Sequence, residues 1–243
     1  MKFEADPQVM GAINNSIPLP DLSKINLKDH MAFGITDREE IILMFTLEQG
    51  KEKHFVPEPD LVVCLFECGR QNAVQLPNLR KNLLSELGDN SKTINNSYTF
   101  YATACVAVTL QLNALEAFIN RQIPNDFEYI SEDTRQTVIQ NKKQIERNTS
   151  FEKKIKDIIP NATGKSFHIT HPDKYTTLSL LKELRDDMTH LKSYHAKNAP
   201  LTYETLYNKA FKFDYLQALN AVKFYINFYS DNLIEPCSCG ADF

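Results

Sequence analysis

The stretch SYTFYATACVAVTLQLNALEAFINRQI, residues 97–123, decides the fold of this chain. It contains neither Gly nor Pro, and Pro124 follows it directly, so no residue within it favours breaking a helix. Its apolar side chains recur at the three- and four-residue spacing of one helical face. These apolar positions are Ala104, Val108, Leu112, Leu115, Phe118 and Ile119. The spacing predicts one long helix with a buried face, against which other helices pack.

The chain that follows is also predicted to be helical. Helices are expected over residues 131–147, 150–160, 175–193 and 202–233. Ser150 is a good helix N-cap, and Pro160 is expected to end the helix that Ser150 begins. The last of these segments is rich in Phe and Tyr, which we interpret as core residues. The sequence therefore predicts a mainly α-helical bundle over residues 97–243.

The chain before this bundle has a different character. Residues 1–34 are interrupted by three prolines and predict an irregular arm. Two short apolar blocks, residues 41–45 and 61–66, are rich in β-branched and aromatic side chains. Such blocks favour buried strands, so we expect a small β-hairpin here.

A domain boundary is expected just before the long helix. Residues 79–87 predict a short helix that Gly88 ends. The polar residues 89–97 follow and are typical of a linker. We therefore divide the chain into an N-terminal extension, residues 1–96, and the helical domain, residues 97–243.

Composition excludes several classes of protein. The chain has 243 residues, of which 42% are hydrophobic and 24% charged, so it is not a disordered or low-complexity protein. A net charge of -4 argues against a protein that coats nucleic acid by its overall charge, although a local basic site is compatible with it. The N-terminus has no apolar signal-peptide region, and the strongly apolar runs are much shorter than the ~20 residues that span a bilayer. We expect a cytoplasmic protein without a membrane interaction.

The five cysteines support the same compartment. An odd and small number of cysteines is not typical of a disulfide framework. Two pairs, Cys64 with Cys68 and Cys237 with Cys239, offer four thiolates, which is the ligand number of a structural zinc site. The single residue between Cys237 and Cys239 is unusual for zinc, so we expect neither a metal nor another cofactor and keep zinc as a competing hypothesis.

The sequence RDDMTH, residues 185–190, holds groups that suit RNA cleavage without a metal ion. Such cleavage uses the 2′-hydroxyl as an internal nucleophile, and it needs a proton-transfer group and a cation beside the phosphate. His190 suits the first task because histidine titrates near pH 6.5, and Arg185 suits the second because its planar fork matches two phosphate oxygens. Asp186 lies four residues before His190 and is expected to face the imidazole, and Thr189 is expected to orient the guanidinium. An exposed ion pair near a helix end is the alternative interpretation.

The surroundings of this motif resemble the HEPN superfamily, small α-helical domains whose active members are ribonucleases. The superfamily signature is an Arg, four to six further residues and a His, at the C-terminal end of the third main helix, usually with a polar residue after the Arg. Arg185, Asp186 and His190 match this signature. The segment ALEAFIN, residues 114–120, resembles the first helix of such domains, and FEKKIKDIIP, residues 151–160, also looks like the superfamily. The resemblance covers about residues 97–233.

The resemblance implies a metal-independent endoribonuclease. His190 would do the acid–base work, Arg185 would stabilise charge in the transition state, and Asp186 would support both. Arg185 and His190 lie about 140° apart around a continuous helix. The two side chains of one copy therefore do not point toward the same phosphate. HEPN ribonucleases pair two chains so that both motifs line one cleft, so a homodimer is expected, with a cleft more basic than the whole molecule.

The resemblance also implies partners. The expected substrate is RNA, and a regulatory or antitoxin partner protein is expected because superfamily members commonly act in toxin–antitoxin systems and antiviral defence. The competing hypothesis is a non-catalytic dimeric module of the same fold that binds RNA or a partner protein.

Overall fold

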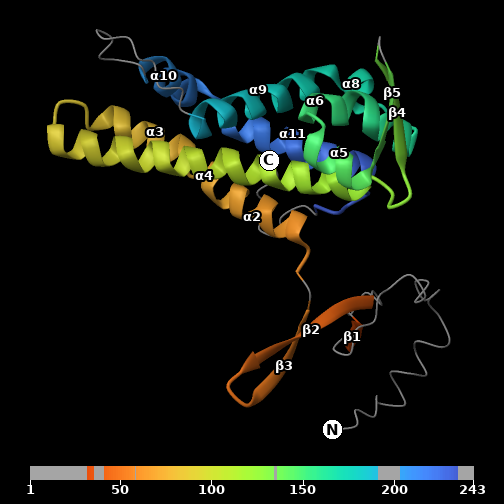
Figure 1. The fold of residues 1–243 in the computed structure, drawn as a ribbon. Helices are drawn as coiled ribbons and strands as arrows, with labels where there is room; N and C mark the ends of the chain where they lie inside the picture. The colour runs from red at the N-terminus through yellow and green to blue at the C-terminus, as the bar shows by residue number, and fades with distance from the viewer. Residues whose placement is uncertain (1–31, 36–40, 58, 134–135, 191–202, 235–243) are drawn as a thin grey trace. The chain divides into compact units, whose positions relative to one another are not determined.

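The computed structural model describes residues 32–35, 41–57, 59–133, 136–190 and 203–234. The chain divides into two compact units, Met1–Pro59 and Asp60–Phe243. The described residues are mainly helical, with two small antiparallel sheets, which confirms the mainly α prediction. Figure 1 shows the elements of each unit.

The first unit contains a three-stranded antiparallel sheet. Its strands are β1 (Ala32–Ile35), β2 (Ile41–Gln49) and β3 (Glu52–Pro57), in that order across the sheet. The turn between β2 and β3 contains Gly50, whose φ of 65° favours glycine. The strand predicted at residues 41–45 is confirmed as part of β2.

The prediction of a second strand at residues 61–66 is wrong. Residues 61–66 begin helix α2 (Leu61–Ala73) instead, and β2 pairs with β1 and β3. The cause is local, because the Asp60 side chain accepts hydrogen bonds from the backbone N–H groups of Val62 and Val63, which is an N-cap. A short apolar run does not separate strand from helix by itself.

Helix α4 (Asn90–Gln122) is the centre of the second unit. It contacts α2, α3 (Leu76–Ser85), α9 (Pro172–Thr189), α10 (Glu204–Lys212) and α11 (Tyr215–Tyr229), as Figure 1 shows. All six apolar positions predicted to face the core of this helix are at most 1% exposed. The main-helix prediction is therefore confirmed in its core.

Helix α4 begins earlier than predicted. Asp89 caps it by accepting a hydrogen bond from the Lys92 backbone N–H, so the helix starts at Asn90 rather than at residue 97. The boundary expected between residues 96 and 97 consequently falls inside α4. The compact units separate between Pro59 and Asp60, because α2 and α3 pack on α4.

Among the described helices, only α4 is long and apolar enough to cross a membrane by those two criteria. Half of its most apolar window is buried within the protein. The core helix of a bundle meets the same criteria, and the contacts of α4 are those of such a core helix.

The predicted helix over residues 131–147 is wrong in its first part. Strands β4 (Glu128–Asp133) and β5 (Gln136–Asn141) form an antiparallel hairpin, and only α5 (Lys142–Asn148) is helical. The β-branched residues Thr137, Val138 and Ile139 explain the strand preference. The change to helix occurs at Asn141, which forms a capping box with Gln144.

The segment that Ser150 begins is confirmed at its start and extends further than predicted. Ser150 caps α6 (Phe151–Lys153), a π-helical turn (Lys154–Ile158) follows, and α7 (Ile159–Thr163) continues past Pro160. Proline is tolerated there because it lies in the first turn of α7. Gly164, with a φ of 73°, ends this segment.

The final helices differ from the prediction mainly in their boundaries. Helix α8 (Phe167–Thr170) precedes α9, which covers the described part of the predicted helix 175–193. The segment 202–233 is two helices, because Asp214 caps α11 through the Gln217 backbone N–H. Among its aromatic residues, Tyr215 and Tyr225 are buried as predicted, whereas Phe224 is 37% exposed.

Candidate functional site

The last turns of α9 hold Arg185 in a fixed position. Its side chain is only 21% exposed, and its Nη2 lies 3.2 Å from the Glu116 Oε1 of α4. Its Nε lies 3.2 Å from Asp186 Oδ1, an ion-pair distance without a hydrogen-bond angle. Arg185 therefore bridges the two central helices of the bundle with a carboxylate on either side.

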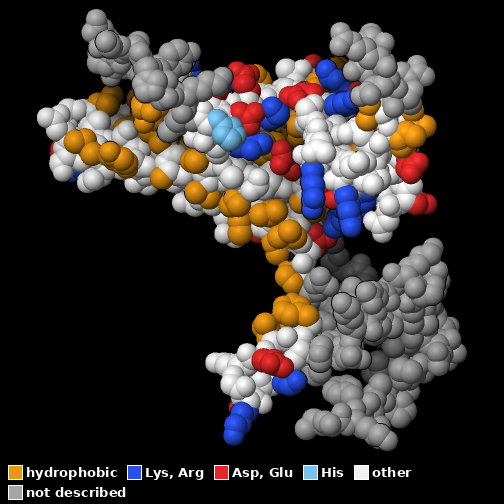
Figure 2. All heavy atoms as spheres, viewed as in Figure 1, with side chains coloured by type: hydrophobic (Ala, Val, Ile, Leu, Met, Phe, Trp, Pro, Cys, Tyr) orange, Lys and Arg blue, Asp and Glu red, His pale blue; other side chains and the backbone are white. Residues whose placement is uncertain are grey.

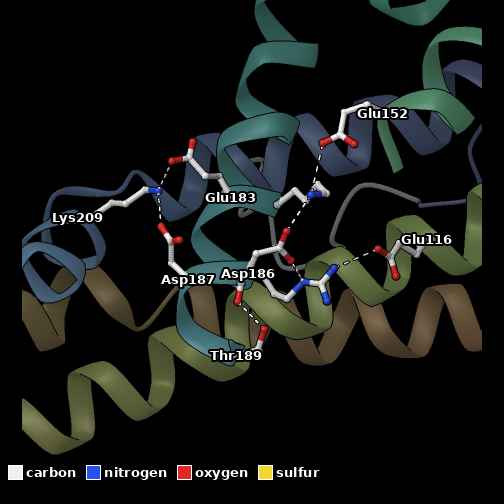
Figure 3. A network of polar contacts seen from close by, with 9 residues as sticks. Glu116, Glu152, Glu183, Asp186, Asp187, Thr189 and Lys209 are labelled. Atoms are coloured by element: carbon white, nitrogen blue, oxygen red, sulfur yellow. Dashed lines mark hydrogen bonds and ion pairs between the residues drawn. The ribbon is translucent and has the colours of Figure 1, made fainter. Parts of the chain in front are cut away.

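The carboxylate of Asp186 faces cations rather than the imidazole of His190. Asp186 Oδ2 lies 2.8 Å from Lys182 Nζ, and Lys182 also lies 3.4 Å from Glu152 Oε1. Its hydrogen bond with Asp186 raises the pKa of Lys182, against the effect of burial. Figure 3 shows the Asp186 carboxylate between two cationic side chains, which are Lys182 and Arg185.

Two expected roles within the motif take another form. Thr189 Oγ1 donates to the backbone carbonyl of Arg185 at 2.8 Å, so it does not orient the guanidinium. The hydrogen bond between Asp186 and His190 runs from the His190 backbone N–H to the Asp186 carbonyl, at 2.9 Å. Both are helix-end contacts, which compete with the side-chain contacts expected from spacing.

His190 is the C-cap of α9 and is exposed to solvent. Its φ of -111° and ψ of 63° depart from helical values, so the helix ends at this residue. The motif prediction depends on this exposed imidazole and on the partly buried guanidinium of Arg185, five residues earlier in the chain.

A second ion-pair cluster joins α9 to α10. Lys209 Nζ lies 2.6 Å from Glu183 Oε1 and 2.7 Å from Asp187 Oδ2, as Figure 3 shows. Burial alone would lower the pKa of Lys209, but the two carboxylates raise it. Asp187 therefore binds the Lys209 ammonium and links α9 to α10.

Lys154 is a site residue that sequence reasoning missed. It is 8% exposed, lies in the π-helical turn, and donates to Asn120 Oδ1 at 2.9 Å and to the Glu146 carbonyl at 3.0 Å. Burial lowers its pKa, and the negative charges of Glu116 and Glu146 oppose that shift. Nothing in its spacing marks it among neighbouring lysines. Glu116 did carry a signal, because it is the one charged residue between Lys92 and Arg121.

The charge around Arg185 is more acidic than expected. Five carboxylates and three cations form the two connected clusters at this end of α9; they are Glu116, Glu152, Glu183, Asp186 and Asp187, with Lys182, Arg185 and Lys209. A basic cleft was expected between the two chains of a dimer. Each chain contributes more carboxylates than cations to these two clusters.

The described part of the chain contains three cysteines, all of them free. Cys64 and Cys68 are exposed on α2, and Cys105 lies on α4. No group of three or more His, Cys, Asp or Glu side chains in the described part of the chain is placed to hold a metal ion. Cys237 and Cys239 lie outside the described residues, so the four-thiolate zinc site stays a competing hypothesis.

No family model, no curated protein and no solved structure matches this chain. The interpretation of the site therefore depends on its residues and their geometry.

Proposed function

We propose that the protein is a metal-independent endoribonuclease of HEPN type that acts as a homodimer. The observation that carries the proposal is the end of α9, where a partly buried arginine held by Glu116 lies five residues before an exposed histidine. The partner carboxylate orients the guanidinium, so less side-chain freedom is lost when it binds a phosphate.

The proposed reaction needs only groups on this chain and the RNA. The 2′-hydroxyl oxygen attacks the adjacent phosphorus, its proton passes to the His190 imidazole of one copy, and the bond from phosphorus to the 5′-oxygen breaks. The imidazolium of the second copy donates a proton to the departing 5′-oxygen, which leaves a cyclic 2′,3′-phosphate and a 5′-hydroxyl. Arg185 stabilises the negative charge on the phosphoryl oxygens.

The proposal includes a cytoplasmic location and a partner protein that restrains the enzyme. A regulator would suit a nuclease that acts in toxin–antitoxin or antiviral defence. The net acidic clusters around Arg185 are one reason to expect such control, because an arginine paired with carboxylates binds phosphate weakly until those carboxylates are displaced.

The same observation favours the second candidate function, a non-catalytic module. Five carboxylates around three cations repel a phosphate backbone at this end of α9. A dimer of this fold would then recognise RNA elsewhere on its surface or bind a partner protein.

Cleavage of a mixed RNA in EDTA separates the two functions. Wild type is compared with His190→Ala, with Arg185→Ala, and with His54→Ala as a matched control on the β3 strand. Loss of cleavage in the first two variants alone supports the enzyme. Cleavage that survives His190→Ala contradicts the assigned site, and absence of cleavage in all four proteins supports the module.

The dimer is tested separately by sedimentation equilibrium of the full chain. A mass near twice 27.9 kDa is expected at micromolar concentration. A monomer at the concentration that gives full cleavage would contradict a two-chain active centre.

A further inference from the structure

Lysines lie over aromatic rings at the end of α9 opposite to Arg185. Lys174 Nζ, in the first turn of α9, is 4.8 Å from the centroid of the Phe224 ring. Lys165 Nζ, just before α8, is 5.8 Å from the centroid of the Phe228 ring. The His171 ring lies edge-on to both, with centroid distances of 4.8 Å to Phe224 and 5.4 Å to Phe228. We call these five residues the lysine–aromatic surface.

The core beneath holds these rings in place. Phe167 is fully buried and contacts Phe224 and Phe228, with centroid distances of 6.2 Å and 5.4 Å. Phe224 is nevertheless 37% exposed, and Lys165 is exposed. The rings are therefore anchored on one side and reach solvent on the other, which costs little ordering entropy when a ligand binds.

A third lysine repeats the arrangement beside this surface. Lys156 Nζ is 5.3 Å from the centroid of the Tyr175 ring, and His168 contacts the same ring at 6.1 Å. Tyr175 directly follows Lys174 on α9. Lysines and aromatic rings thus occur together on the π-helical turn, the loop before α8, α9 and α11.

These lysines have no carboxylate partner in the part of the chain that the structure describes. Within the described residues, no Asp or Glu lies within ion-pair distance of Lys156, Lys165 or Lys174. At the other end of α9, by contrast, Lys182, Arg185 and Lys209 all have carboxylate partners.

Net charge is distributed in the same way along the chain. Residues 142–175 contain eight Lys and Arg against four Asp and Glu, a net charge of +4, although the whole chain carries -4. Figure 2 shows basic side chains gathered over the part of the bundle that contains α5 and α6. The segment that contains Lys156, Lys165 and Lys174 therefore carries more positive than negative charge.

Positive charge interleaved with accessible rings is the chemistry that recognises a single strand of nucleic acid. Lysines contact the phosphates, and unpaired bases stack on aromatic faces, whereas the bases of a duplex already stack on one another. The lysine and ring pairs at this end of α9 place both kinds of group side by side.

We propose that the lysine–aromatic surface, extended by Lys156 and Tyr175, binds single-stranded RNA. The choice of RNA rests on the proposed function. Lys174 and Arg185 are eleven residues apart on one helix, or about 16 Å at the helical rise. That distance is the length of about five stacked nucleotides, so one strand is long enough to reach from this surface to the end of α9.

Binding is measured by fluorescence anisotropy with a labelled twelve-nucleotide oligouridine, in EDTA, on the full chain carrying His190→Ala. The test variant adds Lys156→Gln, Lys165→Gln and Lys174→Gln. The matched control adds Lys81→Gln, Lys92→Gln and Lys212→Gln, which remove the same charge from α3, α4 and α10. The slope of log K against log salt is expected to fall in magnitude by about 2 in the test variant and to stay unchanged in the control.

A second variant tests stacking without a change of charge. Phe224→Leu keeps an apolar side chain over Phe167 but removes the ring face. Binding is expected to weaken by roughly five- to 150-fold, the loss of one stacked base. Unchanged far-ultraviolet circular dichroism shows that each variant is folded.

Several results would overturn this inference. They are no binding by His190→Ala, unchanged binding in the test variant, an equal loss in the control, or equal affinity for an RNA duplex of the same length.

The proposed catalysis fails separately. If wild type cleaves no RNA while the lysine variants weaken binding, the binding surface stands and the nuclease does not. Cleavage by wild type with unchanged binding by the test variant gives the reverse conclusion.

Discussion

Replacement of Gly69 by alanine is expected to destabilise the protein, although alanine is the better helix former. Gly69 lies where α2 crosses α4 and is buried there. A Cβ added to it would lie 3.0 Å from the Gln111 Cγ and 3.1 Å from the Gln111 backbone nitrogen. A side chain can rotate away, but the backbone nitrogen cannot, so the two helices must separate.

The size of the effect follows from two opposing contributions. Alanine in place of glycine inside a helix stabilises by about 1 kcal/mol, and overpacking of a core costs about 1–3 kcal/mol. Because one of the two close contacts is with backbone, we expect the upper half of that range, and a net loss of about 1–2 kcal/mol. For a unit of this size the melting temperature should fall by roughly 2–8 °C.

The measurement is urea and thermal unfolding followed by circular dichroism, with Cys68→Ala as the control. Cys68 is the preceding residue on α2 and is exposed, so its replacement should change stability by no more than about 0.5 kcal/mol. The double variant Gly69→Ala with Gln111→Ala removes the close contact with the Gln111 Cγ but keeps the one with the backbone nitrogen of residue 111. The shorter side chain at residue 111 also leaves unfilled space between α2 and α4. A Gly69→Ala protein as stable as wild type, or more stable, would refute the close packing of α2 on α4.

Three further predictions concern the core, a helix cap and a buried charge. Phe100→Ala removes a fully buried ring from α4 and should cost about 3–5 kcal/mol in urea unfolding; a loss below 1 kcal/mol would contradict the central position of α4. Asp60→Ala removes the α2 cap and an ion pair with Arg121 at 2.6 Å, so a loss of about 1–2 kcal/mol is expected at pH 7. Burial tends to raise the pKa of Asp60, but Arg121 and the cap N–H groups lower it below 3.8, so this stability should disappear as the pH falls through the folded-state value; a difference that persists at lower pH would contradict the assignment. Burial lowers the pKa of Lys154, so between that value and 10.5 the unfolded chain binds more protons, and the stability of wild type relative to Lys154→Met should rise with pH in that window; a flat difference in alkaline unfolding titrations would show that the ammonium is hydrated.

Much of the bundle was predictable from residue pattern. Six of the ten buried positions of α4 were predicted, because apolar side chains at helical spacing in a long run without Gly or Pro indicate one buried helix face. The cap at Ser150 was predicted because a single side chain decides it. Residues 61–66 and 136–141 were assigned to the wrong element, because a short segment fits both helix and strand until its cap or partner strand is known.

The candidate site was predictable in its members but not in its contacts. The spacing of Arg185 and His190 is a property of the sequence, and both lie at the end of α9 as expected. Asp186 was expected beside His190, but Lys182 and Arg185 compete for the same carboxylate and carry full charges. Glu116 and Lys154 come from distant parts of the chain, so no local pattern connects them with the motif.

The sequence by itself determined the apolar stripe of the long helix α4 and the places of the titratable residues of the motif along one helix. These properties depend on helical periodicity, which acts over a few residues. Only the tertiary structure decided the charge that Arg185 meets and the separation of acidic and basic surfaces at the two ends of α9. Electrostatic and packing contacts act between residues that are close in space, and the packing of α4 against α9 and α11 determines which residues those are.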